Sequence, residues 1–173
     1  ILSFLVLPVL ALYSYRVVIR NADWHDEYSL YKSGLNVCPH SLKVLTNFAL
    51  LSMSRGDIEG GLDAALRAVS IYPEQMAALI NAGVAYQKLE RYADSIDMFQ
   101  RCLKVNPDMS KANGYIGVSY YHWAVTQSDA SAAKMLRLEA LKYFNKAINL
   151  GFQAPMILHL TGSTLIDLSR KEE

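Results

Sequence analysis

The stretch that decides the fold is MAALINAGVAYQKLERYADSIDMFQRCLKVNPDM, residues 76–109 of the 173-residue chain. Its pattern recurs at a fixed interval, because Pro39, Pro73 and Pro107 are each 34 residues apart. The same interval separates the pairs Gly83 and Gly117, Tyr86 and Tyr120, and Asn47 and Asn81. Self-similarity at a fixed period indicates a stack of equal units, in which each unit buries its apolar face only against its neighbours.

A period of 34 residues is that of the tetratricopeptide unit, a pair of antiparallel helices joined by a short turn. In residues 76–109 the matching positions are Leu79, Gly83, Tyr86, Ser95, Phe99, Cys102 and the closing Pro107. In residues 42–75 they are Leu45, Ala49, Ser52, Gly61, Ala65, Ala68 and Pro73. Because Ser52 and Ala65 stand where aromatic residues are usual, we expect looser packing in this unit. The sequence therefore predicts an all-α solenoid of helical hairpins.

The third unit, residues 110–154, carries about eleven extra residues before Ala140, Phe144 and Ala147 resume the pattern. An insertion of this length makes close to three helical turns, so the apolar face keeps its phase. We expect two lengthened helices, a turn around residues 128–131 that caps the second helix, and Gly151 as its stop. Residues 155–173 resemble the first helix of a further unit, with Leu158, Gly162 and Leu165 at the matching positions.

An uncharged apolar run, ILSFLVLPVLALYSY, occupies residues 1–15 and is followed by Arg16 and Arg20. The chain begins with Ile and its methionines are all internal, so we interpret it as a fragment of a longer protein. We interpret residues 1–20 as the C-terminal part of a transmembrane helix in contact with the lipid bilayer, with Tyr13 and Tyr15 as interfacial anchors. The alternative is a first helix of a soluble core, which Pro8 and the missing polar face disfavour.

Residues 21–41 form the junction between the apolar run and the repeats. Asp23 is predicted to be the N-cap of a helix over residues 24–38, with Asp26 completing a short capping box. That helix places Tyr31, Gly34 and Pro39 at the positions of a second repeat helix. The junction is therefore interpreted as an incomplete repeat.

Composition and motifs point away from catalysis and nucleic acid. Hydrophobic residues make up 52% of the chain and the net charge is +1, which suits a packed core and does not suit a phosphate-binding polycation. Cys38 and Cys102 lack metal-site spacing, the four histidines are scattered, and no phosphate loop or nucleophile motif is present. Cys102 falls on a buried repeat position. We predict no catalytic residue, no metal site and no cofactor in this segment.

The first helices of the hairpins are expected to line a concave groove that binds an extended peptide or protein. The predicted binding residues are Lys43, Asn47, Leu50, Asn81, Val84, Lys88, Lys111, Tyr115, Val118 and His122, with Ser54 beside them. Asn47 and Asn81 would stack one unit apart, and a side-chain amide can donate to and accept from a peptide backbone at once. The alternatives are that the asparagines are merely tolerated at the surface, or that the three lysines clamp an acidic C-terminus.

The junction also carries the most specific resemblance. Its residues Arg20, Asn21, Asp23, Trp24, Glu27, Ser33, Gly34, Leu35, Val37, Cys38, Pro39, Lys43 and Val44 resemble the transmembrane and tetratricopeptide repeat-containing (TMTC) family. The resemblance implies an endoplasmic-reticulum membrane protein whose upstream membrane domain transfers mannose from dolichyl-phosphate mannose to proteins, notably cadherin-type domains. It implies that the catalytic acidic residues lie upstream and that the repeats face the lumen and recruit the acceptor. The rival hypothesis is a membrane-anchored, non-enzymatic scaffold or co-chaperone.

Overall fold

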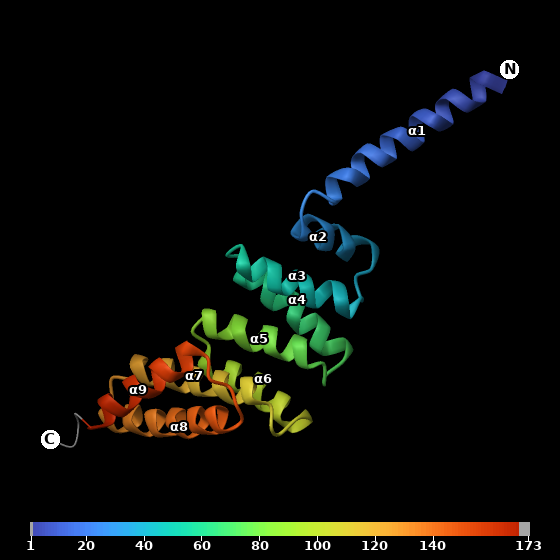
Figure 1. Cartoon of the computed structure of the whole chain (residues 1–173). Coiled ribbons are helices and arrows are strands. Elements are labelled where there is room, and N and C mark those ends of the chain that lie inside the picture. Colours follow the sequence, from blue (N-terminus) through green and yellow to red (C-terminus); the bar gives the residue numbers. More distant parts are fainter. Residues whose placement is uncertain (1, 170–173) are drawn as a thin grey trace.

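The structure, a computed structural model, describes residues 2–169, and within that range its regular secondary structure is all α-helix, with no strand (Figure 1). Its nine described helices are α1 (Leu2–Asp23), α2 (Glu27–Val37), α3 (Leu42–Ser54), α4 (Ile58–Ile71), α5 (Met76–Lys88), α6 (Tyr92–Val105), α7 (Ser110–Thr126), α8 (Ala130–Asn149) and α9 (Pro155–Ser169). The predicted all-α solenoid is thus confirmed. Three hairpins, α3–α4, α5–α6 and α7–α8, stack in chain order, with α2 packed before them and α9 after them.

Each of the second and third hairpins is closed by a small residue that lies under a large one. A Cβ atom added to Gly83 would lie 2.6 Å from the ring of Phe99, and one added to Gly117 would lie 2.5 Å from the ring of Phe144. Both phenylalanine side chains are fully buried. The predicted close crossing of the helices at these two glycines is therefore confirmed, and no residue larger than glycine fits without movement.

The first hairpin lacks this ring contact, and its two helices meet closely at Gly61 instead, where an added Cβ would lie 2.6 Å from Met53 Cγ and 2.8 Å from the Ala49 carbonyl oxygen. Ala49 and Ala65 stand at the positions of the glycine and the phenylalanine and are both fully buried. Ser52, which replaces the aromatic residue, is also fully buried, and its Oγ has no hydrogen-bond partner. The small residues at these positions therefore do not expose the interior of the hairpin, but they leave the Ser52 hydroxyl buried without a hydrogen-bond partner.

The third hairpin is the enlarged one, as the sequence predicts. α7 has 17 residues and α8 has 20, against 13 in α5 and 14 in α6. The side chain of Asp129 accepts hydrogen bonds from the backbone N–H groups of Ser131 and Ala132, both at 3.1 Å, and so caps α8. Gly151 follows α8 with a φ of +87°, the left-handed conformation that ends a helix.

A basic side chain in the second helix of each hairpin donates to the carbonyl oxygen of the proline that closes the preceding unit. The pairs are Arg67 Nη2 with Pro39 (3.2 Å), Arg101 Nη2 with Pro73 (3.2 Å) and Lys146 Nζ with Pro107 (3.4 Å). The partners are 28 residues apart in the first two pairs and 39 in the third. The difference equals the insertion read from the sequence, so the enlarged hairpin keeps the contacts of the shorter ones.

The prediction for the start of the second helix was wrong. Asp23 belongs to the last turn of α1, and Asp26 is the N-cap of α2. The Asp26 carboxylate accepts from the Ser29 backbone N–H at 2.8 Å, and the Ser29 Oγ accepts from the Asp26 N–H at 3.2 Å, which completes the capping box. The apolar helix runs on through residue 23, so the first free cap position comes three residues later.

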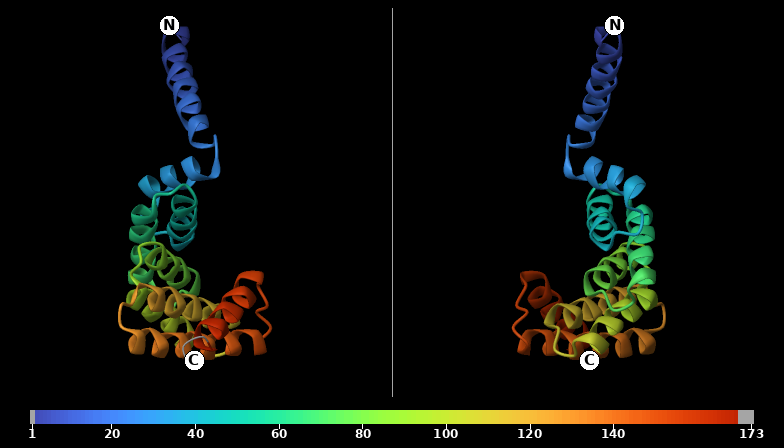
Figure 2. Two further views of the ribbon diagram at one scale, coloured as in Figure 1. Left: turned by 90° about the vertical axis from the view of Figure 1, so that its left-hand side faces the viewer. Right: turned by 90° about the vertical axis from the view of Figure 1, so that its right-hand side faces the viewer.

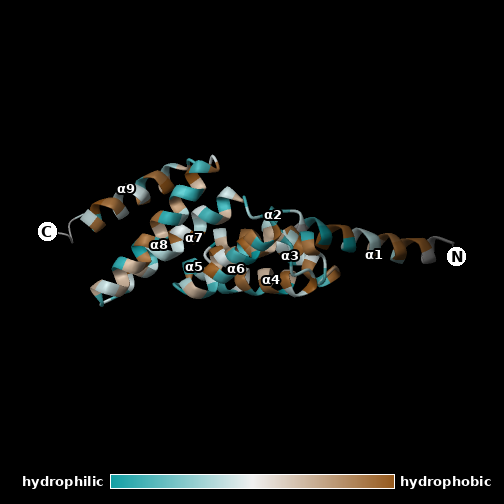
Figure 3. Cartoon of the chain, turned by 90° about the horizontal axis from the view of Figure 1, so that it is seen from below, coloured by the Kyte–Doolittle hydropathy of each residue, from teal (hydrophilic) through white to brown (hydrophobic). Residues whose placement is uncertain are grey.

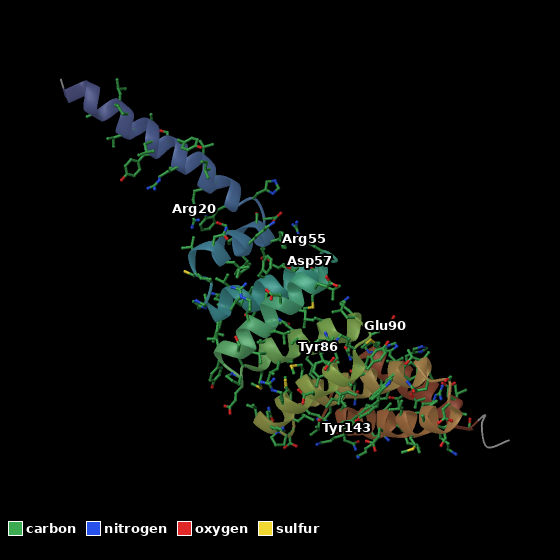
Figure 4. The ribbon with its side chains drawn as sticks, turned by 180° about the vertical axis from the view of Figure 1, so that it is seen from behind. Arg20, Arg55, Asp57, Tyr86, Glu90 and Tyr143 are labelled. Carbon is green, nitrogen blue, oxygen red and sulfur yellow. The ribbon has the colours of Figure 1, made fainter. Side chains whose placement is uncertain are left out.

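Asp26 also fastens α2 to the first hairpin. Arg55 lies at the turn between α3 and α4 (Figure 4). Its Nη2 atom is 2.8 Å from the Asp26 Oδ2 atom, and its guanidinium stacks 4.5 Å from the Tyr28 ring centroid. Tyr28 in turn stacks on Phe48, with centroids 5.4 Å apart. The Ser29 backbone N–H and the Arg55 guanidinium lower the pKa of the Asp26 carboxyl to about 2.

α1 extends away from the stacked hairpins, and most of its length is apolar (Figures 1 and 3). The exposed large side chains along it are Val6, Leu7, Val9, Leu10, Leu12, Tyr13, Tyr15, Val17, Val18 and Ile19. Arg20 Nη1 donates to the Ser33 Oγ of α2 at 3.4 Å. Among the described residues, no helix combines the length and the apolar character that crossing a membrane requires.

α9 is covered on one face only and leaves the stack on one side (Figure 2). Ile157 and Thr164 are fully buried against the preceding hairpin, whereas Leu158 and Leu165 remain 48% and 50% exposed. Gly162 has no atom within 4 Å of an added Cβ, although the equivalent Gly83 of α5 lies under an aromatic ring of α6. The face predicted to meet a second helix is therefore uncovered within residues 2–169.

Candidate functional site

The candidate site is the solvent-exposed side of the first helices of the three hairpins, α3, α5 and α7, which we call the A-helix face. Five of the predicted binding residues are exposed or partly exposed charged and apolar side chains there: Lys43, Leu50, Lys88, Lys111 and His122, with Ser54 beside them. Four are half-buried: Asn47, Asn81, Val84 and Tyr115. Val118 is only 6% exposed and packs against the Phe144 cluster. The A-helix face thus presents mainly lysine ammonium groups and one imidazole.

Three predicted residues meet in one hollow. Lys88, Val118 and His122 line a hollow of about 430 Å³ together with Gln87, Glu90, Tyr92 and Met156. The hollow lies between α5, α7 and the first turn of α9, and the turn before α6 closes one side. The remaining predicted residues do not line it. Apolar Val118 and Met156 lie in the hollow beside the charged Lys88 and Glu90, and such a mixed lining suits a site that receives a side chain of a bound peptide.

Tyr92 and Met156 were not predicted to contribute. Tyr92 opens α6, and its ring stacks on His122 with centroids 6.4 Å apart. Partial burial, together with the nearby Glu90 carboxylate, raises the pKa of the Tyr92 hydroxyl above its ordinary value. Met156 comes from the helix after the enlarged hairpin. The signal for Tyr92 was its place directly after the short α5–α6 turn, which puts it beside the end of the first helix.

Asn47 and Asn81, predicted to stack one unit apart, are not both free to bind a peptide backbone. Asn81 Nδ2 donates to the carbonyl oxygen of Thr46 at 2.9 Å, so this amide joins α5 to α3 of the preceding hairpin. One N–H and the Oδ1 atom of Asn81 are not used in that bond. At the next repeat position, the ring of Tyr115 packs between Phe99 and Phe152, with centroid distances of 5.2 Å and 6.5 Å. The run of asparagines therefore ends at Asn81.

A buried polar network supports the hollow from behind. Gln87 Nε2 donates to the Tyr115 carbonyl oxygen at 2.9 Å and to the Ser119 Oγ at 2.8 Å. The Ser119 and Ser95 hydroxyl oxygens lie 3.1 Å apart, and Ser95 Oγ donates to the Gly83 carbonyl oxygen at 2.9 Å. Both serines are fully buried. This network links α5, α6 and α7 and fixes the position of Gln87 at the edge of the hollow.

Cys102 and the possible metal ligands are the groups of the described residues whose reactivity the structure addresses. Cys102 is fully buried, as predicted, and burial raises the pKa of its thiol to about 11, so it carries no reactive thiolate at neutral pH. Among the side chains that the structure describes, no three of His, Cys, Asp or Glu gather as metal ligands.

Comparison with sequence relatives agrees with this architecture. The tetratricopeptide repeat family model matches residues 77–109. The chain is 26% identical over 155 residues to the protein O-mannosyl-transferase Tmtc3 of Drosophila melanogaster, covering 87% of this chain and 17% of that protein. It is 32% identical over 75 residues to the human protein O-mannosyl-transferase TMTC1, covering 43% of this chain and 8% of that protein. The chain therefore spans about a sixth of the Tmtc3 relative.

Comparison with solved structures gives the same fold. The crystal structure of a thermophilic TPR protein of Thermus thermophilus has a TM-score of 0.67 at 14% identity and covers 76% of this chain and 69% of that one. The first TPR domain of Spaghetti (RPAP3), bound to an HSP90 peptide, has a TM-score of 0.63 at 16% identity and covers 74% of this chain and 93% of that one. The chain is a tetratricopeptide solenoid, and the resemblance of its sequence is to the TMTC protein O-mannosyl-transferases.

Proposed function

We propose that this segment is the protein-binding module of an endoplasmic-reticulum membrane O-mannosyltransferase. In this proposal an upstream membrane domain transfers mannose from dolichyl-phosphate mannose, and the A-helix face recruits the acceptor, a cadherin-like protein. The observation that carries the proposal is the hollow shared by Lys88, Val118 and His122, within a chain that is similar over most of its length to Tmtc3. The RPAP3 domain, whose fold this chain shares, was solved with a bound peptide, which supports a peptide or protein as the ligand.

The proposal includes the orientation of the chain. We propose that the exposed apolar side chains of α1 contact the lipid bilayer and that the repeats face the lumen. The long apolar surface of α1, with Leu10 57% and Val18 69% exposed, supports lipid contact because water does not favour so large an apolar area. The lumenal orientation is proposed on the family resemblance of the junction residues alone.

Recruitment is tested by a pull-down of cadherin-type ectodomains with the chain. The variant is Lys88→Ala plus His122→Ala, which removes the ammonium group and the imidazole from the hollow. The matched control is Lys104→Ala plus His40→Ala, because both of these residues are exposed and lie outside the hollow. We expect the unaltered chain and the control to retain the ectodomain and the hollow variant to lose most of it. Failure of the unaltered chain to retain any ectodomain overturns acceptor recruitment.

Orientation is tested separately, with an N-glycosylation tag inserted beside Glu74 in the exposed loop between α4 and α5 of the full-length protein. Modification of the tag in cells supports the lumenal proposal. A tag that stays unmodified, in a protein that binds membranes, supports the rival hypothesis of a cytosolic non-enzymatic scaffold or co-chaperone.

A further inference from the structure

The lengthened α7 forms a wall beside the turn of the preceding hairpin. The repeat interval of 34 residues places Lys88, the last residue of α5, level with His122, but α7 continues to Thr126. The added turn of α7 lies against the turn between α5 and α6, and together they enclose a second hollow of about 350 Å³. We call it the turn hollow. Its lining residues are Glu90, Arg91, Tyr92, Ala93, Asp94, Trp123 and Thr126.

Packing holds the two aromatic rings of the turn hollow in place. Trp123 is half-buried, and its ring stacks on that of Tyr120 with centroids 6.5 Å apart. Tyr120 in turn stacks on Tyr143 of α8, at 5.8 Å. Tyr92 is also half-buried, and its ring stacks on His122. Rings that are already ordered in this way bind a ligand with little further loss of side-chain entropy.

The charges at the turn hollow have opposite charges close by. Arg91 Nε donates to Asp94 Oδ2 at 2.8 Å, and the guanidinium lies 4.6 Å from the centroid of the Tyr86 ring. Glu90, in the turn between α5 and α6 (Figure 4), also lines the adjoining hollow together with Lys88. The turn hollow therefore offers hydrogen-bonding groups rather than an excess of one charge, which favours a neutral ligand.

A neutral ring that carries several hydroxyl groups matches this lining. The Trp123 and Tyr92 rings give apolar surface of fixed shape for the C–H face of such a ring. The two carboxylates accept hydrogen bonds from hydroxyl groups, and the guanidinium donates them. Thr126 Oγ1 donates to the Trp123 carbonyl oxygen at 2.8 Å and still has lone pairs that accept. The volume is near the lower limit of small-molecule sites, about 300–1,000 Å³, which suits a single ring.

We propose that the turn hollow binds a neutral hexose ring that is carried by a protein partner. This inference adds a sugar-binding site to the proposed protein-binding function, and only the protein-linked source of the sugar rests on that function. The turn hollow and the hollow at Lys88 share Glu90 and Tyr92, so a partner with its sugar in one would have neighbouring residues beside the other. A proline-rich segment, which aromatic grooves also bind, has few groups that would satisfy the carboxylates and the guanidinium.

The experiment uses the fluorescence of Trp123. The chain has two tryptophans, and Trp24, 65% exposed after α1, is replaced by Trp24→Phe so that Trp123 is the reporter. The whole chain, in a sugar-free detergent, is titrated with methyl α-mannoside, with a hexuronic acid and with cyclohexanol, a ring that has one hydroxyl group. We expect the mannoside to bind with a Kd of about 1 mM, as suits so small a ligand. The other two compounds should bind about tenfold or more weakly.

Two variants of α6 locate the site. Asp94→Asn removes a carboxylate that lines the turn hollow, and Asp97→Asn makes the same change on an exposed residue of α6 outside it. We expect Asp94→Asn to weaken mannoside binding about fivefold or more and Asp97→Asn to leave it unchanged. A threonine peptide that carries one mannose should bind about tenfold more tightly than the methyl mannoside or the bare peptide, because sugar and peptide contacts then act together.

Several outcomes overturn the sugar site: no saturable response to the mannoside, equal binding of cyclohexanol, tighter binding of the hexuronic acid, or equal losses in the two variants. Tighter binding of a proline-rich peptide than of the mannoside also overturns it. Equal affinity for the mannosylated peptide and the methyl mannoside overturns the protein-linked source. None of these results decides acceptor recruitment, because Lys88 and His122 of the pull-down variant do not line the turn hollow.

Discussion

Glu90 holds in the second hairpin the left-handed backbone position that Gly56 holds in the first. Their φ values are +59° and +91°. Glu90 lies at the turn between α5 and α6 (Figure 4), and Gly56 lies at the turn between α3 and α4. In both turns the next N–H reaches back to a carbonyl oxygen five residues earlier: Asp57 to Ser52 at 3.0 Å and Arg91 to Tyr86 at 2.9 Å. The turn is the same, but only the first hairpin has the residue that adopts this conformation without a steric cost.

Glu90→Gly is therefore expected to stabilise the protein, although Glu90 is charged and exposed. The relief of the left-handed strain should raise the free energy of unfolding by about 0.5–1 kcal/mol. The measurement is the urea midpoint of unfolding, followed by circular dichroism. Gly56→Ala should shift the midpoint the other way by a similar amount. A lower midpoint for Glu90→Gly would show that the turn does not impose the strain described.

Gly83→Ala should lower the free energy of unfolding, because the added methyl group meets the Phe99 ring. The added methyl group would lie 2.6 Å from the fully buried Phe99, so the two helices must separate or the ring must move. We expect a loss of about 1–3 kcal/mol in the free energy of unfolding. Gly162→Ala is the matched control, because Gly162 is also a helical glycine at the equivalent position but meets no atom. That control should gain up to about 1 kcal/mol from helix propensity. Similar effects at the two sites would contradict the packing account.

Two buried serines should respond in opposite ways to the same change. Ser52 Oγ is buried without a partner, so Ser52→Ala removes an unsatisfied hydroxyl and should be neutral or stabilising by up to about 1 kcal/mol. Ser95 Oγ donates to the Gly83 carbonyl oxygen and lies against Ser119, so Ser95→Ala leaves both without that partner. It should destabilise by about 1–2 kcal/mol. Thermal unfolding of the two variants in parallel checks this, and a loss at Ser52 as large as that at Ser95 would count against it.

The sequence predicts the hairpins well, because the residues that pack one helix against another recur at a fixed interval. Gly83 and Phe99 pack against each other, and the same contact recurs between Gly117 and Phe144 despite the insertion.

Helix caps and individual side-chain partners are harder to predict from the sequence. Asp23 and Asp26 are both good caps, and only the length of α1 decides between them. The hydrogen bond of Asn81 to Thr46, and the meeting of Tyr92 with Met156 at the hollow, depend on the distance between stacked units. That distance depends on how whole hairpins pack, so the residues next to each partner in the sequence do not predict it.

Acid should loosen the contact between α2 and the first hairpin through Asp26. The Ser29 N–H and Arg55 lower the pKa of its carboxyl from 3.8 to about 2 in the folded chain. A lowered pKa means that the folded state favours the ionised form, so this stabilisation is fully present above about pH 4 and fades as the pH falls towards 2. Asp26→Asn should remove this part of the pH dependence of the unfolding midpoint. Arg55→Ala should only reduce it, because the Ser29 N–H remains. Two variants with the slope of the unaltered chain between about pH 4 and pH 2 would show that the Asp26 contacts do not hold α2 in place.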